Sequence, residues 1–235
     1  MTTPSGHTQH DPILAQAGEL WLEAALAEHA SIASFARFVQ ELLWHAAPPE
    51  LVASALQAAA EEVEHAQTSF RIASRLLGDS MGPGPLPLVP PRELSVTGLA
   101  LSTFEEACIE ESFGALLAAT AAEHCTDDDI RNALLKIADE EARHAELAWR
   151  TLSWALQVQG DGVRDAIDAH IAKRHVLRFP NETDALELPL LSLGVVTGHT
   201  LHQVETRSWH EIVLPLWAEL RASSSSQHPT PLAGD

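Results

Sequence analysis

Two glutamate–histidine pairs in this sequence share one spacing. Glu62 stands three positions before His65 in the stretch EEVEHA. Glu141 stands three positions before His144 in the stretch EEARHA. Residues three positions apart lie on one face of an α-helix, so each pair can present a carboxylate and an imidazole to one metal ion. The repeated spacing indicates two halves of one metal site, with two look-alike solvated helix faces as the alternative.

Two further glutamates interrupt apolar helical stripes. Glu28 lies between Ala25 and Ile32, and Glu111 lies one helical turn after Cys108. A carboxylate on a core face is costly to bury unless a cation compensates its charge. One glutamate from each of two helices and Glu-x-x-His from each of two others can hold two divalent ions in a helical bundle. The ligand types favour iron, with manganese as a possibility. The predicted metal ligands are Glu28, Glu62, His65, Glu111, Glu141 and His144.

The sequence predicts an all-α protein in which four long helices carry these ligands. Apolar residues recur with the helical period, and no long stretch alternates with period two. The helices are predicted over 13–46, 49–77, 94–124 and 127–158. A long proline- and glycine-rich connection joins the second helix to the third. Glu62 lies as many residues beyond Pro48 as Glu141 lies beyond Asp127, so the two Glu-x-x-His pairs are expected at the same height in their helical hairpins.

The order of the segments predicts a four-helix bundle with a C-terminal addition. Residues 13–158 are assigned to the bundle and its dinuclear site, and 159–221 to helices that pack on it. Within the addition, 162–174 is predicted as a short helix, 179–189 as a loop, and 197–221 as a helix that Pro215 can kink. Residues 1–12 and 222–235 are predicted to be flexible tails from their composition.

Composition excludes several classes of protein. The chain of 235 residues carries 14 basic and 33 acidic side chains, a formal net charge of −19, which disfavours a nucleic-acid partner. Two cysteines without a CxxC motif exclude a disulfide framework and a cysteine zinc knuckle. We expect no membrane span, because no apolar run approaches 18 residues. The polar N-terminal stretch does not resemble a signal peptide, which predicts a cytoplasmic location.

From about residue 14 to 158 the chain resembles the ferritin-like di-iron carboxylate superfamily, and the tRNA-hydroxylase-like branch looks nearest. That branch has a motif like EA-x-x-x-E-x-F in its third helix, and EACIEESF stands here from Glu106 to Phe113. Its fourth helix has a motif like EARH, which is present from Glu141 to His144. The resemblance implies a ferritin-like bundle whose six ligands hold two irons. Glu110 remains an alternative to Glu111 as the ligand from the third helix.

Two activities are compatible with this resemblance. The first is an oxygenase that uses O₂ as co-substrate, takes electrons from a donor protein and oxidises a small or carrier-tethered organic molecule. The second is a ferroxidase or iron-storage protein, and a binding protein without redox activity is a third reading. The two cysteines exclude a rubredoxin-like module, and the lack of tyrosine excludes a tyrosyl-radical subunit. We favour the oxygenase, with no membrane partner and with a homodimer as a possible assembly.

Other polar residues receive a structural interpretation. Glu61 and Glu64 are expected to face water, and Cys108 is expected to be a small buried apolar residue. Glu105, Glu106 and Glu140 are expected at the surface or behind the ligands. His199, His202 and Glu205 recur at helical spacing, which predicts a polar helix face or, alternatively, a second metal site.

Overall fold

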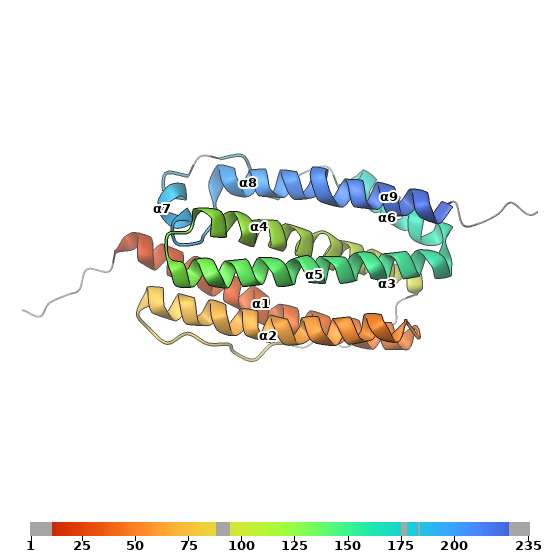
Figure 1. The fold of residues 1–235 in the computed structure, drawn as a ribbon, viewed down its shortest axis with the longest axis horizontal. Helices are drawn as coiled ribbons and strands as arrows, with labels where there is room; N and C mark the ends of the chain where they lie inside the picture. Colours follow the sequence, from red (N-terminus) through yellow and green to blue (C-terminus); the bar gives the residue numbers. More distant parts are fainter. Residues whose placement is uncertain (1–10, 88–94, 175–177, 183, 226–235) are drawn as a thin grey trace, which may run out of the picture.

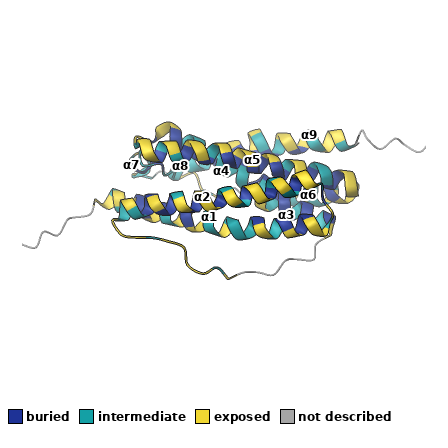
Figure 2. Ribbon diagram, turned by 60° about the horizontal axis from the view of Figure 1, so that its bottom comes forward, coloured by how far each residue is buried: buried dark blue, intermediate teal, exposed yellow. Residues whose placement is uncertain are grey.

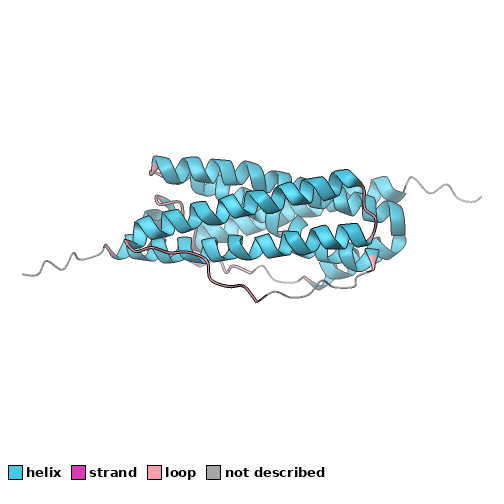
Figure 3. Ribbon diagram, turned by 90° about the horizontal axis from the view of Figure 1, so that it is seen from below, coloured by secondary structure: helices cyan, strands magenta, loops and turns pink. Residues whose placement is uncertain are grey.

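The computed structural model describes residues 11–87, 95–174, 178–182 and 184–225. Every regular element in these ranges is helical, and none of the described residues forms a strand (Figure 3). This confirms the all-α prediction. No helix within the described ranges is both long enough and apolar enough to span a membrane.

Four long helical rods lie side by side (Figure 1). α1 packs along α2, α4 packs along α5, and the two hairpins meet most closely where α2 contacts α5. The third rod is made of α3, a π-helical segment η1 and α4. The elements of the four rods are α1 (Pro12–Trp44), α2 (Pro49–Leu77), α3 (Val96–Thr103), η1 (Phe104–Cys108), α4 (Glu110–His124) and α5 (Asp128–Gln159).

Local chemistry sets the ends of these helices. An Asp11 side-chain oxygen accepts a hydrogen bond from the backbone N–H of Ile13 at 2.9 Å, so α1 begins inside the predicted 1–12 tail. Residues 1–10 of that tail lie outside the described ranges. α2 ends at Gly78, whose φ of 71° is the left-handed conformation that favours glycine. Asp127 accepts from the backbone N–H groups of Asp129 and Ile130, both at 3.0 Å, and thereby starts α5.

The C-terminal elements form a further layer on the side of α4 and α5 opposite to α1 and α2 (Figure 1). α8 and η2 contact α4, and α9 contacts α5. η2 is a second π-helical segment and lies just before Pro215, which has no N–H to donate to the preceding turn. The elements are α6 (Asp161–Lys173), α7 (Glu187–Leu191), α8 (Gly198–Arg207), η2 (Ser208–Val213) and α9 (Leu214–Ser225).

Two boundaries of this region differ from the prediction. α9 continues to Ser225, so the first residues of the predicted 222–235 tail are helical, and 226–235 lie outside the described ranges. The predicted 179–189 loop contains the start of α7 at Glu187. The serines at the end of α9 and the short segment with prolines around α7 are weak signals of helix boundaries. Neither determines the residue at which a helix begins or ends.

Buried residues recur along all four rods, alternating with exposed ones (Figure 2). One end of the core contains Trp21, Ile130 and Leu134, and it is closed by the segment between α7 and α8. Trp21 Nε1 donates a hydrogen bond to the Leu193 carbonyl at 3.0 Å. Gly194, with φ +76°, comes so close that an added Cβ would lie 2.6 Å from Ile130 Cγ2. The C-terminal layer is therefore fastened directly to the end of the helical bundle.

Candidate metal centre

All six predicted ligands meet inside the bundle, and they come from α1, α2, α4 and α5. Their ligand atoms form two groups, and within each group these atoms lie within 4.8 Å of one another. Glu62 and Glu141 belong to both groups. The first group adds Glu28 and His65, and the second adds Glu111 and His144. Two central carboxylates, each with a place in both groups, are arranged to bridge two ions.

The imidazole Nδ1 atoms point into the cluster. His65 Nδ1 lies 3.2 Å from Glu141 Oε1 and 3.8 Å from Glu28 Oε2. His144 Nδ1 lies 3.1 Å from Glu62 Oε1. The Nδ1 atoms of both rings and Oε2 of Glu62 are buried and have no hydrogen-bond partner among the described residues. Each such atom costs about 1–3 kcal/mol when left unsatisfied, and two divalent ions would satisfy all three. The donor set therefore fits a dinuclear centre.

The other nitrogen of each imidazole is held by an acid from the opposite helix. His65 Nε2 on α2 lies 3.0 Å from Glu140 Oε2 on α5. His144 Nε2 on α5 lies 2.8 Å from Glu61 Oε2 on α2. A carboxylate in this position fixes the ring orientation and leaves Nδ1 free for a metal. Each of the two helices α2 and α5 therefore carries one histidine of the site and the acid that contacts the other histidine.

The expectation that Glu61 faces water is wrong. Its side chain is 13% exposed and touches His144, whereas the Glu64 side chain is 64% exposed and pairs with Lys136. The signal was present in the sequence, because EEVEH and EEARH both place an acid four positions before the histidine. The histidine that each acid contacts depends on how α2 is rotated against α5, and the sequence does not give that rotation.

Without metal ions, bound protons offset the negative charge of the clustered carboxylates. Burial, with the carboxylates of Glu141 and Glu62, raises the pKa of Glu28 well above its usual range. Burial and contact with Glu141 do the same to the pKa of Glu111. Burial disfavours the imidazolium of His144, but contact with Glu111 and Glu141 outweighs it and raises the pKa of the ring to about 12. The cluster thus retains protons where cations would otherwise balance the carboxylates.

The geometry distinguishes Glu111 from Glu110. Glu111 belongs to the second ligand group. Glu110 points to the C-terminal layer, where its two oxygens lie 2.8 and 2.7 Å from Arg178 Nη1. Cys108 is fully buried and belongs to neither group, and burial together with Glu111 raises the pKa of its thiol well above the usual range. Cys108 therefore remains a neutral apolar residue beside the site.

His199, His202 and Glu205, which form a row on α8, have a structural role. Glu205 is buried and accepts hydrogen bonds from the backbone N–H groups of Arg178 and Phe179 at 2.8 and 2.9 Å. His202 Nδ1 lies 2.7 Å from the Phe179 carbonyl, and His199 Nδ1 contacts a side-chain oxygen. The described residues of this row join no metal-ligating group. They hold the segment before α7 against α8.

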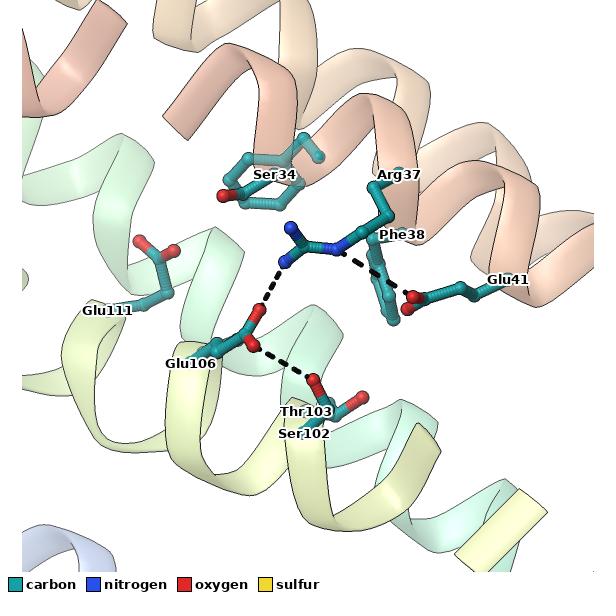
Figure 4. A pocket seen from close by; sticks show the side chains of 10 residues that line it. Ser34, Arg37, Phe38, Glu41, Ser102, Thr103, Glu106 and Glu111 are labelled. Atoms are coloured by element: carbon teal, nitrogen blue, oxygen red, sulfur yellow. Dashed lines mark hydrogen bonds and ion pairs between the residues drawn. The ribbon is translucent and has the colours of Figure 1, made fainter. Parts of the chain in front are cut away.

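The π-helical segment η1 determines which side chains flank Glu111. Its backbone includes a bond from the Ile109 N–H to the Phe104 carbonyl at 3.2 Å, which spans five residues. Residues five apart face the same side across such a widened turn. Glu106 and Glu111 consequently line one small pocket of about 50 Å³ (Figure 4). Arg37 of α1 pairs with Glu106 in this pocket.

Glu61 and Glu140, the acids that contact the two histidines, provide a test of the candidate metal centre. We expect Glu61→Ala to weaken binding of the ion held by His144 by about 10–100-fold, and Glu140→Ala to weaken the ion held by His65 by a similar factor. Titration of the metal-free protein with Mn²⁺ under anaerobic conditions would measure both affinities. Glu64→Ala removes an exposed acid from the same helix and should bind as the wild type does. Wild-type affinity at both sites in both variants would contradict the assigned contacts.

Comparison of the chain with protein-family models, with curated proteins and with solved structures gave no match. The functional assignment therefore depends on the chemistry and geometry of this chain alone.

Proposed function

We propose that this chain is a ferritin-like non-haem di-iron oxygenase that hydroxylates a small or carrier-tethered organic substrate. The observation that carries the proposal is a cluster of four glutamates and two histidines that borders an apolar pocket. Glu28 and Glu141 lie both in the cluster and in the wall of that pocket. A cofactor that activates dioxygen and a pocket that excludes water are the two parts an oxygenase needs.

The residues have distinct tasks in this proposal. Glu62 and Glu141 would each be shared by the two ions, and His65 and His144 would each hold one of them through Nδ1. When two irons are bound, they supply the redox chemistry that reduces dioxygen. Hydroxylation consumes one O₂, two electrons and two protons per product and releases one water, so an electron-donor protein must deliver the electron pair. The chain itself orients the ligands and keeps the substrate beside them.

A ferroxidase or iron-storage protein is the second candidate. The small pocket beside Glu111 favours it, because Glu41 and Glu106 also line that pocket and carboxylates attract iron. Arg37 lies among these acids and offsets part of their charge. The apolar pocket on the other side of the cluster has no use in storage, and we therefore favour the oxygenase.

Exposure of the reduced protein to oxygen separates the two candidates. Protein loaded anaerobically with Fe²⁺ should oxidise the two bound irons per chain and then stop, because each oxygenase centre needs new electrons before it can react again. Iron oxidation is followed by absorbance, oxygen uptake with an electrode, and assembly size by analytical ultracentrifugation. Continued uptake of iron far beyond two ions per chain, in a large hollow assembly, would contradict the oxygenase and establish storage.

A further inference from the structure

An apolar pocket of about 250 Å³ lies between α1 and α4, on the side where the two hairpins do not meet closely. Its walls come from α1, α2, α4, α5 and the segment between α7 and α8. Apolar side chains make most of its lining, among them Trp21, Leu117, Leu134, Ile137, Val195 and Val196. The C-terminal layer thus supplies one wall of a pocket that reaches the metal cluster.

The polar groups of this pocket are few. Its charged lining residues are Glu28 and Glu141, and both are candidate metal ligands. Among the described residues, no lysine, arginine or histidine lines it to balance a negatively charged ligand. Ser69 is 1% exposed, and its hydroxyl has no hydrogen-bond partner in the part of the chain that the structure describes. An unpartnered buried hydroxyl in the wall can make one hydrogen bond to a bound molecule. An anion there would meet two carboxylates, and a cation would find these carboxylates already engaged by the metal ions.

Gly114 leaves the path from the pocket to the cluster open. It lies inside α4, where glycine costs about 0.5–1 kcal/mol relative to alanine. Its φ is not positive, and an added Cβ would meet Glu141 at an ordinary distance of 3.8 Å. Neither the backbone nor a steric clash therefore requires glycine at this position. What the missing side chain provides is space directly in front of Glu141.

The pocket volume sets the size of the ligand. An apolar cavity of about 150 Å³ accommodates benzene. By that scale, about 250 Å³ accommodates on the order of ten non-hydrogen atoms. A monocyclic molecule with a short substituent has this size.

We propose that the substrate of this site is an uncharged, predominantly apolar molecule of that size, and that Gly114 sets how closely it approaches the metal centre. The chemical step rests on the proposed oxygenase function, but binding in the pocket does not. Ser69 offers the one hydrogen bond that orients the molecule, and Gly114 places one end of it beside Glu141.

Binding of trifluoromethylbenzene, followed by ¹⁹F NMR, tests this proposal in the metal-loaded protein. The probe should bind, and its signal should broaden more in protein loaded with Mn²⁺ than in protein loaded with Zn²⁺, because only Mn²⁺ relaxes nearby nuclei. The cationic analogue 4-(trifluoromethyl)benzylammonium should bind about tenfold more weakly, because the two bound metal ions already engage the carboxylates of Glu28 and Glu141 and its charge would lose water without a partner. Equal or tighter binding of the cation, or equal broadening with both metals, would overturn the proposal.

Two variants of α4 locate the probe. Gly114→Val should weaken binding by about tenfold, because its methyl groups enter the space before Glu141. Ala119→Val makes a similar change on α4 in a different groove and should leave binding unchanged. If the valine variant does not fold, Gly114→Ala, whose Cβ fits, should still weaken binding severalfold. Unchanged binding in a folded Gly114 variant would contradict the assigned position.

The test also separates this proposal from the proposed function. If the protein failed to retain metal, the probe should still bind the metal-free protein and lose affinity on Gly114→Val. That result would support the pocket and reject the di-iron chemistry. Retention of two metal ions without any probe binding would reject the pocket and leave the metal centre in place.

Discussion

Glu62→Ala should bind at most one metal ion per chain where the wild type binds two. Glu62 has a place in both ligand groups, and its side chain is 1% exposed. Its Oε1 lies 3.1 Å from His144 Nδ1 and its Oε2 lies 3.9 Å from His65 Nδ1. Loss of this carboxylate removes one anionic ligand from each ion, whereas loss of His144 removes a ligand from one ion. We therefore expect Glu62→Ala to have the larger effect and His144→Ala to retain one ion.

Metal content is the direct measurement. The metal-free proteins would be incubated anaerobically with Fe²⁺, freed of unbound metal and analysed by atomic emission. Glu62→Gln preserves the size of the side chain and should lose metal as the alanine variant does, which separates loss of charge from loss of packing. Glu64→Ala is the matched control on the same helix and should retain two ions. Two ions per chain in folded Glu62→Ala would show that the centre is elsewhere.

The positions of the ligands could be predicted because they depend on local geometry. Three-residue spacing places Glu62 with His65 on one helix face, whatever that helix packs against. The apolar neighbours of Glu28 show which face is buried. The starts and ends of α2 were equally predictable, because proline at a first turn and glycine at Gly78 act through their own backbone.

Features that depend on how helices are rotated against each other could not be predicted. Glu61 is in contact with His144 because α2 and α5 present these residues to each other, and neither sequence stretch alone specifies that. The π-helical turn before Glu110 changes the helical phase, so that Glu106 joins Glu111 on one side. With a uniform helical period, those two acids would lie on different faces of the helix.

The pocket wall formed by Val195 and Val196 is another feature that the sequence could not predict. The sequence indicates a C-terminal addition, but it does not indicate which end of the bundle the addition covers. Gly194 permits the contact by its positive φ and its lack of a side chain, yet a glycine in a loop is compatible with many paths. The direction of the chain after α7 is a product of tertiary packing.

Removal of the metal should lower the stability of the protein strongly. A ligand at a hundred times its dissociation constant stabilises the folded state by about 2.7 kcal/mol per site. Two sites therefore contribute about 5 kcal/mol, which for a chain of this length raises Tm by about 10–20 °C. Thermal unfolding of chelated and Mn²⁺-loaded protein would measure the difference. Glu62→Gln should show little difference in Tm between its chelated and Mn²⁺-loaded forms. A rise in Tm equal to that of the wild type would contradict metal binding at this cluster.

The stabilisation of the folded protein by bound metal should increase as the pH rises from about 5.5 to about 7.5. The raised pKa values of Glu28 and Glu111 mean that the folded metal-free protein binds protons there that the unfolded chain releases. Stability of the metal-free protein therefore falls as the pH rises above the usual glutamate range. The raised pKa of His144 acts in the same direction, because its contribution is complete below the usual histidine pKa and is lost as the pH rises. Metal ions replace these protons, so the Tm difference between loaded and chelated protein should be larger at the higher pH, and a difference that shrinks would contradict ligation by these residues.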